Sequence, residues 1–211
     1  MFADKPIIGI TGGIGSGKTY VSNLFGELGC VVIEADALVR EAYQDQELLR
    51  SLRSWLPTEV FKADGTVDRR AMATHVFSNR QDRMKLEGIV HPWVARRRDA
   101  IMSAADKNAP AFIWDTPLLF ETGLYKNCDA LVFVDSPESE RFARVSTTRG
   151  WSIEELRKRE ILQWPLDKKK ELSKYILSNS KSEAMMHPTI QVEDIKTQVK
   201  NILSRIASGC K

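Results

Sequence analysis

The chain has 211 residues, of which 43% are hydrophobic and 28% are charged. These fractions are near the averages of globular proteins, so they exclude a disordered or fibrous chain. The formal net charge of +3 is too small to indicate a nucleic-acid-binding protein. We expect one domain, with room for a small insertion.

No apolar run approaches the roughly 20 residues of a membrane-spanning helix, and the N-terminus lacks the basic-then-apolar layout of a signal peptide. The cysteines Cys30, Cys128 and Cys210 are few, odd in number and widely spaced, which is typical of free thiols in a reducing compartment. The three histidines are also scattered and predict no metal cage. We expect a soluble cytoplasmic protein that acts on neither membranes nor nucleic acids.

Short apolar segments alternate with helical patterns along the chain. The first ends in glycines, as a strand buried on both faces does. An amphipathic helix follows at about residues 21–28, and the tail returns to a helix with Ile195, Val199, Ile202 and Ile206 on one face. The expected strands are residues 6–10, 30–33, 111–114, 130–134 and, more weakly marked, 175–177. This alternation predicts a parallel α/β sheet of about five strands.

Two stretches depart from the alternation. Residues 38–107 carry helical patterning without a convincing strand, and we interpret them as a helical insertion. Residues 138–170, here named the lid, are charged and rich in arginine: Arg141, Arg144, Arg149, Arg157 and Arg159. The nucleotide-binding core is then expected at about 1–37, 108–137 and 171–211.

A phosphate-binding loop follows the first strand and precedes the first helix. Its residues are Gly12, Gly13, Ile14, Gly15, Ser16, Gly17, Lys18 and Thr19, which satisfy G-x4-G-K-[ST]. Glycines allow backbone N–H groups to turn inward around a triphosphate, and the helix N-terminus adds partial positive charge. Lys18 is expected to reach the β- and γ-phosphates, and Thr19 to ligand Mg²⁺. The motif predicts a P-loop fold, three layers of α/β/α, that binds ATP or GTP.

Several kinds of P-loop protein remain possible on these residues alone. A GTPase switch needs an Asn-Lys-x-Asp guanine reader, which the sequence lacks. The small size, helical insertion and Arg-rich lid favour a small-molecule kinase. A kinase for nucleosides, nucleotides or shikimate-like alcohols fits this pattern, and a non-catalytic ATP-binding regulator is the other alternative.

Three aspartates follow strand segments, where open α/β sheets bind their ligands. Asp36 is our candidate to take the proton of an acceptor hydroxyl, because we expect the second strand to neighbour the strand that leads into the loop. A helix N-cap is the alternative for Asp36. Asp115 is a candidate site acid or a turn residue before Pro117, and Asp135 is more typical of a turn.

Three other conspicuous groups have simple structural interpretations. Residues 96–98 (Arg-Arg-Arg) and 168–170 (Lys-Lys-Lys) are expected on solvated faces. His91-Pro92 most simply marks a helix break, because proline disfavours helix at the preceding residue.

Several segments together resemble the dephospho-CoA kinase family. They run in family order over about residues 7–179 and are more specific in combination than the phosphate loop alone. The segments are Ile10–Thr19, Ala35–Arg40, Asp64–Arg69, Val76-Phe77, Leu86–Pro92 with its Leu-Glu…His-Pro pattern, Asp115–Glu121 (DTPLLFE), the arginines Arg144, Arg149 and Arg159, and Gln163–Lys168.

The resemblance implies that Mg-ATP phosphorylates the ribose 3′-hydroxyl of dephospho-CoA, on a P-loop core with a helical CoA-binding part and a lid. It implies Asp36 as general base, Lys18, Arg144 and Arg149 as further catalytic residues, and Asn179 on the adenine side. The implied acceptor-binding residues are Asp36, Arg40, Leu86, His91, Pro92, Asp115 and Leu118. It implies Thr19 and Asp115 at the metal, and we expect a monomer or weak homo-oligomer.

The sequence departs from the family pattern at three places. Thr19 replaces the more usual serine and keeps the hydroxyl. Ser173-Lys174 stands where a small residue and an aspartate are common, so no role is assigned there. The segment from Ser180 to Pro188 lacks an expected glycine.

Overall fold

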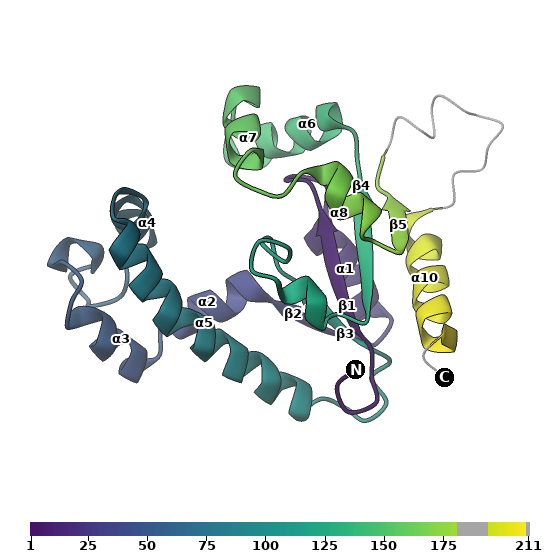
Figure 1. The fold of residues 1–211 in the computed structure, drawn as a ribbon, viewed down its shortest axis with the longest axis horizontal. Coiled ribbons are helices and arrows are strands. Elements are labelled where there is room, and N and C mark those ends of the chain that lie inside the picture. The colour runs from purple at the N-terminus through teal and green to yellow at the C-terminus, as the bar shows by residue number, and fades with distance from the viewer. Residues whose placement is uncertain (181–193, 210–211) are drawn as a thin grey trace. The chain divides into compact units, whose positions relative to one another are not determined.

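The computed structural model describes residues 1–180 and 194–209, so Cys210, His187 and the departure at residues 181–188 lie outside the described residues. Five parallel strands form one sheet in the order β2-β3-β1-β4-β5 (Figure 1). The strands are β1 (Ile7–Gly12), β2 (Val31–Glu34), β3 (Phe112–Asp115), β4 (Ala130–Asp135) and β5 (Tyr175–Ser178). The predicted parallel five-stranded α/β sheet is confirmed.

The strand beside β1 on one side is β3, with Ile10 in register with Asp115. The expectation that the second strand neighbours the loop strand is therefore wrong, because β2 pairs only with β3 in this sheet. Burial gives the physical reason: every residue of β3 is buried, whereas three of the four residues of β2 are partly exposed. The more apolar strand takes the central place, and it brings Asp115 next to the strand that leads into the phosphate loop.

Two helices cover one face of the sheet. They are α1 (Lys18–Glu27) and α10 (Ile195–Gly209), which pack against each other. The predicted apolar faces are confirmed, since Val21, Leu24 and Phe25 of α1 enter the same core as the α10 positions Val199, Ile202 and Ile206. Helix α10 also packs against the edge strand β5, at the end of the sheet opposite β2 (Figure 1).

The contacts divide the chain into two compact units: Met1–Glu34 with Ala105–Lys211, and Ala35–Ala104. The first unit also holds η2 (Leu124–Asn127), α6 (Glu138–Arg149), α7 (Ile153–Glu160) and α8 (Leu166–Glu171). The second unit holds α2 (Ala35–Ala42), α3 (Gln46–Arg53), η1 (Thr58–Val60), α4 (Arg69–Ser78) and α5 (Arg80–Ser103). Within the described residues, no helix combines the length and the apolar character needed to cross a bilayer.

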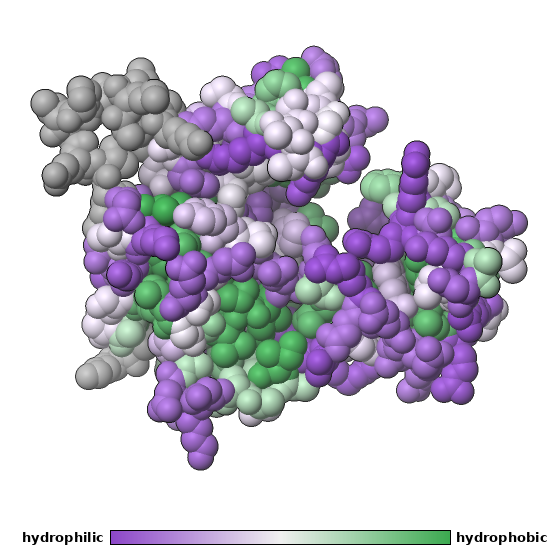
Figure 2. All heavy atoms as spheres, turned by 180° about the vertical axis from the view of Figure 1, so that it is seen from behind, coloured by the Kyte–Doolittle hydropathy of each residue, from purple (hydrophilic) through white to green (hydrophobic). Residues whose placement is uncertain are grey.

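The second unit has its own small core beneath a mostly hydrophilic surface, visible on the right of Figure 2. Its helices begin at capping aspartates: Asp45 accepts from Leu48 N, and Asp68 from Ala71 N. Such caps satisfy amide groups that the first helical turn leaves unpaired. The buried residues that hold the unit together are Ala42, Leu48, Leu49, Leu52, Leu56, Val60, Val67, Met72, Leu86 and Val90.

Helix α5 runs without interruption through Pro92. The interpretation of His91-Pro92 as a helix break is therefore wrong. Proline costs the helix one hydrogen bond, to the carbonyl of Gly88. Packing overrides that cost, because α5 buries Leu86 and Val90 before the proline and packs Trp93 and Val94 against the same core after it.

Gly88 provides a test of this account of α5. It lies in the helix interior, and a Cβ atom there would have open space around it. Glycine in a helix costs about 0.5–1 kcal/mol relative to alanine, so Gly88→Ala should raise the free energy of unfolding by that amount. Urea denaturation monitored by circular dichroism measures it.

The control is Gly29→Ala. Gly29 has φ of +86°, which alanine tolerates poorly, so this variant should lose about 1 kcal/mol or more. A loss of stability in Gly88→Ala would contradict the uninterrupted helix.

Candidate active site

The phosphate loop connects β1 directly to α1, as predicted. Gly12, Gly15 and Gly17 have φ of +144°, +79° and +93°, values that side-chain-bearing residues rarely adopt. Space is restricted as well, because a Cβ atom at Gly12 would lie 2.6 Å from the Val134 carbonyl oxygen. The glycines thus allow the loop to turn tightly against β4 and to present its amides at the end of the sheet.

Lys18 closes over its own loop. Its Nζ donates to the carbonyl oxygens of Gly12 and Gly13, at 3.1 and 2.9 Å. Burial lowers the pKa of Lys18 to about 8; the positive charges of Lys169, Arg149 and Arg141 act in the same direction, while Asp115 opposes them. A lysine that is costly to keep charged in the free protein gains strongly from a polyanion beside it.

Two arginines of α6 hold the loop from outside. Arg144 donates to the carbonyl oxygens of Gly15 (3.1 Å) and Ser16 (3.3 Å), and to that of Asn179 (2.8 Å). Arg141 is only 5% exposed and donates to the Ile14 carbonyl oxygen at 3.2 Å. Because these carbonyls are bound by protein donors, the loop amides other than those of Ile14 and Ser16, which have protein acceptors, are left to face a ligand.

Glu160 at the end of α7 completes this arrangement. Its Oε1 accepts from the backbone N–H of Ile14 at 3.1 Å and from Arg141. The lid therefore contacts the phosphate loop through an acidic side chain. Glu160 was not predicted from the sequence, where its only signal is a carboxylate at the end of an arginine-rich segment.

Asn179 and Arg149 have different surroundings. Asn179 follows β5 and donates from Nδ2 to the Ser16 carbonyl oxygen at 2.7 Å, so this predicted residue does lie at the loop. Arg149 ends α6 and lies 4.8 Å from the ring centroid of Trp151, which Arg159 approaches to 4.3 Å. Arg149 thus contacts no loop carbonyl in the described contacts, but its charge contributes to the lowered pKa of Lys18.

Hard oxygen donors gather near the loop. The Thr19 side chain is exposed in the first turn of α1, and Asp115 is 6% exposed at the end of β3. Asp115 acts electrostatically on Lys18, which places its carboxylate close to the loop. A hydroxyl and a carboxylate are the kinds of ligand that Mg²⁺ takes in phosphate-binding sites, so the residues fit this ion. Leu118, three residues further, is 42% exposed.

The remaining predicted residues belong to the second unit. Asp36 and Arg40 are both exposed on α2, one turn apart. Asp36 is the second residue of the helix, so the N-cap alternative for it is wrong. On α5, His91 and Pro92 are exposed while Leu86 is buried in the unit's core; the side chain of Leu86 packs there.

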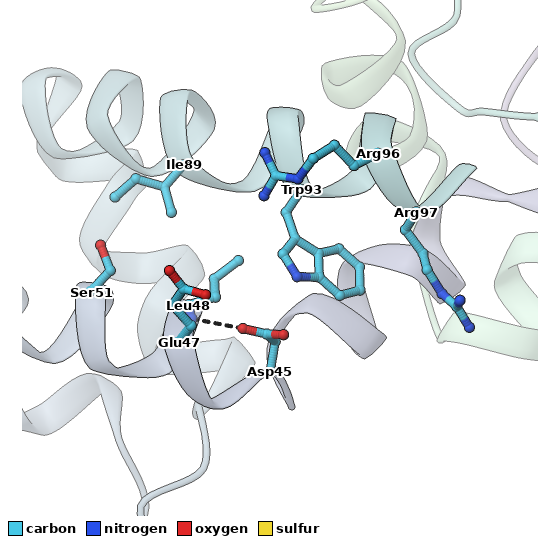
Figure 3. Close-up of a pocket in the computed structure, with 8 residues that line it drawn as sticks. All are labelled: Asp45, Glu47, Leu48, Ser51, Ile89, Trp93, Arg96 and Arg97. Carbon is cyan, nitrogen blue, oxygen red and sulfur yellow. Dashed lines mark hydrogen bonds between the residues drawn. The ribbon is translucent and has the colours of Figure 1, made fainter. Parts of the chain in front are cut away.

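A hollow of about 360 Å³ lies between α3 and α5 of the second unit (Figure 3). Trp93 provides an apolar wall, and charged residues of both signs surround it: Asp45, Glu47, Arg96 and Arg97. The Arg97 guanidinium pairs with Glu41 at 2.7 Å. Opposed charges give the hollow no preference for an anion. The predicted solvated face at residues 96–98 is confirmed for Arg96 and Arg97, which are exposed, but not for Arg98, whose side chain is 16% exposed.

The glycine loop lies at the carboxyl edge of a parallel sheet, and arginines and Lys18 bind its carbonyls. This arrangement is that of a P-loop phosphotransferase of the small-molecule kinase class. The family model described as dephospho-CoA kinase matches residues 6–185. This chain belongs to the dephospho-CoA kinase family.

Individual relatives agree with the family model. A dephospho-CoA kinase from Syntrophotalea carbinolica is 34% identical over 97% of this chain and 94% of its own length. One from Thermus thermophilus is 35% identical over the same shares. A crystal structure of a T. thermophilus protein superposes with a TM-score of 0.79 at 35% identity, covering 95% of this chain and 97% of that one. A dephospho-CoA kinase from Campylobacter jejuni shares the fold, with a TM-score of 0.67 at 23% identity.

The lowered pKa of Lys18 predicts proton uptake on nucleotide binding. Below pH 8 the Lys18 amine is already protonated in the free protein. Above pH 8 the amine has lost its proton, so ATP binding must be coupled to uptake of that proton. ATP affinity should therefore fall as pH rises through about 8. Calorimetry at pH 8.5 in buffers of different ionisation enthalpy should show uptake of a fraction of one proton per ATP.

The matched control is Lys18→Arg, since a guanidinium stays charged throughout this range. Its ATP binding should take up no proton. Wild-type binding without proton uptake would contradict the lowered pKa.

Proposed function

We propose that this protein transfers the γ-phosphoryl group of ATP to the ribose 3′-hydroxyl of dephospho-CoA, giving coenzyme A and ADP in the final step of CoA biosynthesis. Membership of the dephospho-CoA kinase family over nearly the full length is the observation that carries the proposal. The phosphate loop with Lys18 supplies the part of the chemistry common to all such kinases.

The donor side is assigned to the phosphate loop. Loop amides and the Lys18 ammonium would bind the β- and γ-phosphates, where they stabilise charge that moves during transfer. Thr19 and Asp115 would hold Mg²⁺, which when bound neutralises charge on the β- and γ-oxygens. Asn179, whose Nδ2 donates to the Ser16 carbonyl oxygen, would lie on the adenine side of the nucleotide.

The acceptor side is assigned to residues of the second unit. Asp36 would accept the proton of the 3′-hydroxyl as its oxygen forms a bond to the γ-phosphorus and the bond to the bridging β-oxygen of ATP breaks, releasing ADP. Arg40, one turn along α2, would bind a phosphate of dephospho-CoA. His91 and Pro92, exposed on α5, are the acceptor-binding candidates there.

The two lid arginines Arg144 and Arg149 are assigned different roles. Arg144 has its guanidinium committed to the loop carbonyls and to Glu140, so it would act by holding the loop in its binding shape. Arg149 is exposed, and only cation–π contact with Trp151 engages it in the described contacts. It is the better candidate to reach the transferring phosphoryl group.

Three expectations from the sequence stay predictions: Mg²⁺ as the metal, a cytoplasmic location, and a monomer or weak homo-oligomer.

Acceptor dependence distinguishes the proposal from its alternatives. ADP release with Mg-ATP should be stimulated strongly by dephospho-CoA and not by adenosine, AMP or shikimate. Release with one of these other acceptors would indicate a different small-molecule kinase. ATP binding without any acceptor-dependent release would indicate a nucleotide-binding regulator.

Asp36→Asn tests the assignment of the base. The amide keeps the size of the side chain but cannot accept the proton, so kcat should fall by about 10²–10⁴-fold. ATP affinity, measured by calorimetry, should stay unchanged, because the loop binds the nucleotide. Normal turnover in this variant would remove Asp36 from the mechanism.

A further inference from the structure

Lys169 is the most deeply buried charged side chain among the described residues. It lies in the Lys168–Lys170 run that the sequence predicts to be solvated, and that prediction is wrong for Lys169: its side chain is 1% exposed, against 61% for Lys168 and 44% for Lys170. The cause is helical geometry, since three successive residues of α8 point in different directions and one of them must face the sheet.

The ammonium of Lys169 joins two segments that are far apart in the sequence. Its Nζ lies 2.8 Å from Glu121 Oε1 and 3.1 Å from Gln163 Oε1. Glu121 belongs to the segment that leaves β3 after Asp115, whereas Gln163 lies in the lid. Glu121 Oε1 also accepts from the backbone N–H of Trp164 at 2.8 Å, so one carboxylate fixes both the lid's last turn and α8.

Apolar packing surrounds this polar cluster. The Trp164 ring lies against Phe120 and Tyr125, at centroid distances of 5.6 and 5.9 Å, and Phe120 stacks on Tyr125 at 4.6 Å. Glu121 Oε2 is buried and has no hydrogen-bond partner among the described residues. Although burial opposes it, the hydrogen bonds from Lys169 and Trp164 lower the pKa of Glu121. The Glu121 carboxylate therefore stays ionised at neutral pH although its side chain is only 16% exposed.

A buried ion pair fills space less favourably than apolar side chains do. Removing two ions from water carries a large desolvation penalty for each, and well-packed apolar residues often stabilise a fold equally well or better. What an ion pair adds is a fixed direction and a defined set of partners. Here the pair joins the end of the lid to the turn segment that follows β3 after Asp115, and α8 itself packs on β1.

We infer that Lys169 is a positioning residue for phosphoryl transfer: paired with Glu121 and Gln163, it anchors the C-terminal end of the lid beside β1, so that the lid contacts of the loop are held in register. The inference rests on the proposed function. Helix α8 packs on β1, the strand that leads into the phosphate loop, and the charge of Lys169 acts on Lys18, both of which agree with this role.

Steady-state kinetics with Mg-ATP and dephospho-CoA test the inference, with kcat and KM measured separately. Lys169→Met should lower kcat by about 10- to 100-fold with little change in KM for either substrate, because alignment in the transition state is lost and not ground-state binding. Lys169→Arg keeps the charge and the donors and should restore most of kcat. The control Lys168→Met removes an exposed neighbouring lysine and should behave as wild type.

A second variant covers the case in which Lys169→Met fails to fold with Glu121 left unpaired. Glu121→Gln with Lys169→Met removes both charges, and circular dichroism should show a folded protein. Its kcat should stay low if the ion pair positions the lid. A folded double variant with wild-type kcat would overturn the inference, as would a folded Lys169→Met with wild-type kcat.

The same assay separates this inference from the proposed function. If the wild-type protein releases no ADP in response to dephospho-CoA, the proposed function fails and the inference fails with it. If the wild type turns over and the charge-free variants match it, only the role of Lys169 is overturned.

Discussion

The backbone carbonyls of the phosphate loop must be bound by protein donors so that loop amides are available to a ligand. Of these amides, those of Ile14 and Ser16 already have protein acceptors. Lys18, Arg141 and Arg144 are the donors to the carbonyls of Gly12, Gly13, Ile14, Gly15 and Ser16. A loop with three positive φ values has no regular secondary structure to satisfy its carbonyls. The cations therefore shape the loop before a nucleotide binds.

That solution concentrates positive charge, and the fold balances it with carboxylates from the lid and from the segment after β3. Glu160 pairs with Arg141, Glu140 with Arg144, and Glu121 with Lys169. Glu160 also fixes α7 relative to the phosphate loop, and Glu121 fixes Trp164 and α8 relative to the segment after β3, whereas the Glu140–Arg144 pair lies within α6. The same contacts thus balance the positive charge and place the lid. For this reason the lid residues matter to the chemistry even where they touch no substrate.

The sequence predicts the parts of this arrangement that depend on local pattern. The motif places Lys18 and Thr19 after a buried strand, and all five strands and the two helices that cover the sheet appear where apolar spacing expects them. Strand order escaped prediction, because it depends on whether β2 or β3 is more completely buried. Pro92 misled for a related reason: core contacts on both sides of it outweigh the local preference of proline.

Side-chain pairing over long distances in the sequence was equally hidden. Lys169 lies in a run of lysines and so has the local pattern of a solvated residue. Only its contact with Glu121, 48 residues earlier in the sequence, accounts for its buried position. Glu160 likewise gains its meaning from Ile14. Roles that arise from such contacts cannot be found by spacing within one segment.

We expect a phosphate loop held in this way to deliver the γ-phosphoryl group of ATP to one particular hydroxyl. The most direct measurement is ³¹P NMR of the product formed from Mg-ATP and dephospho-CoA, with the 3′-deoxy analogue as control. The account predicts a new phosphomonoester at the ribose 3′ position and no product from the analogue. Phosphate on another hydroxyl, or an equal reaction with the analogue, would contradict it.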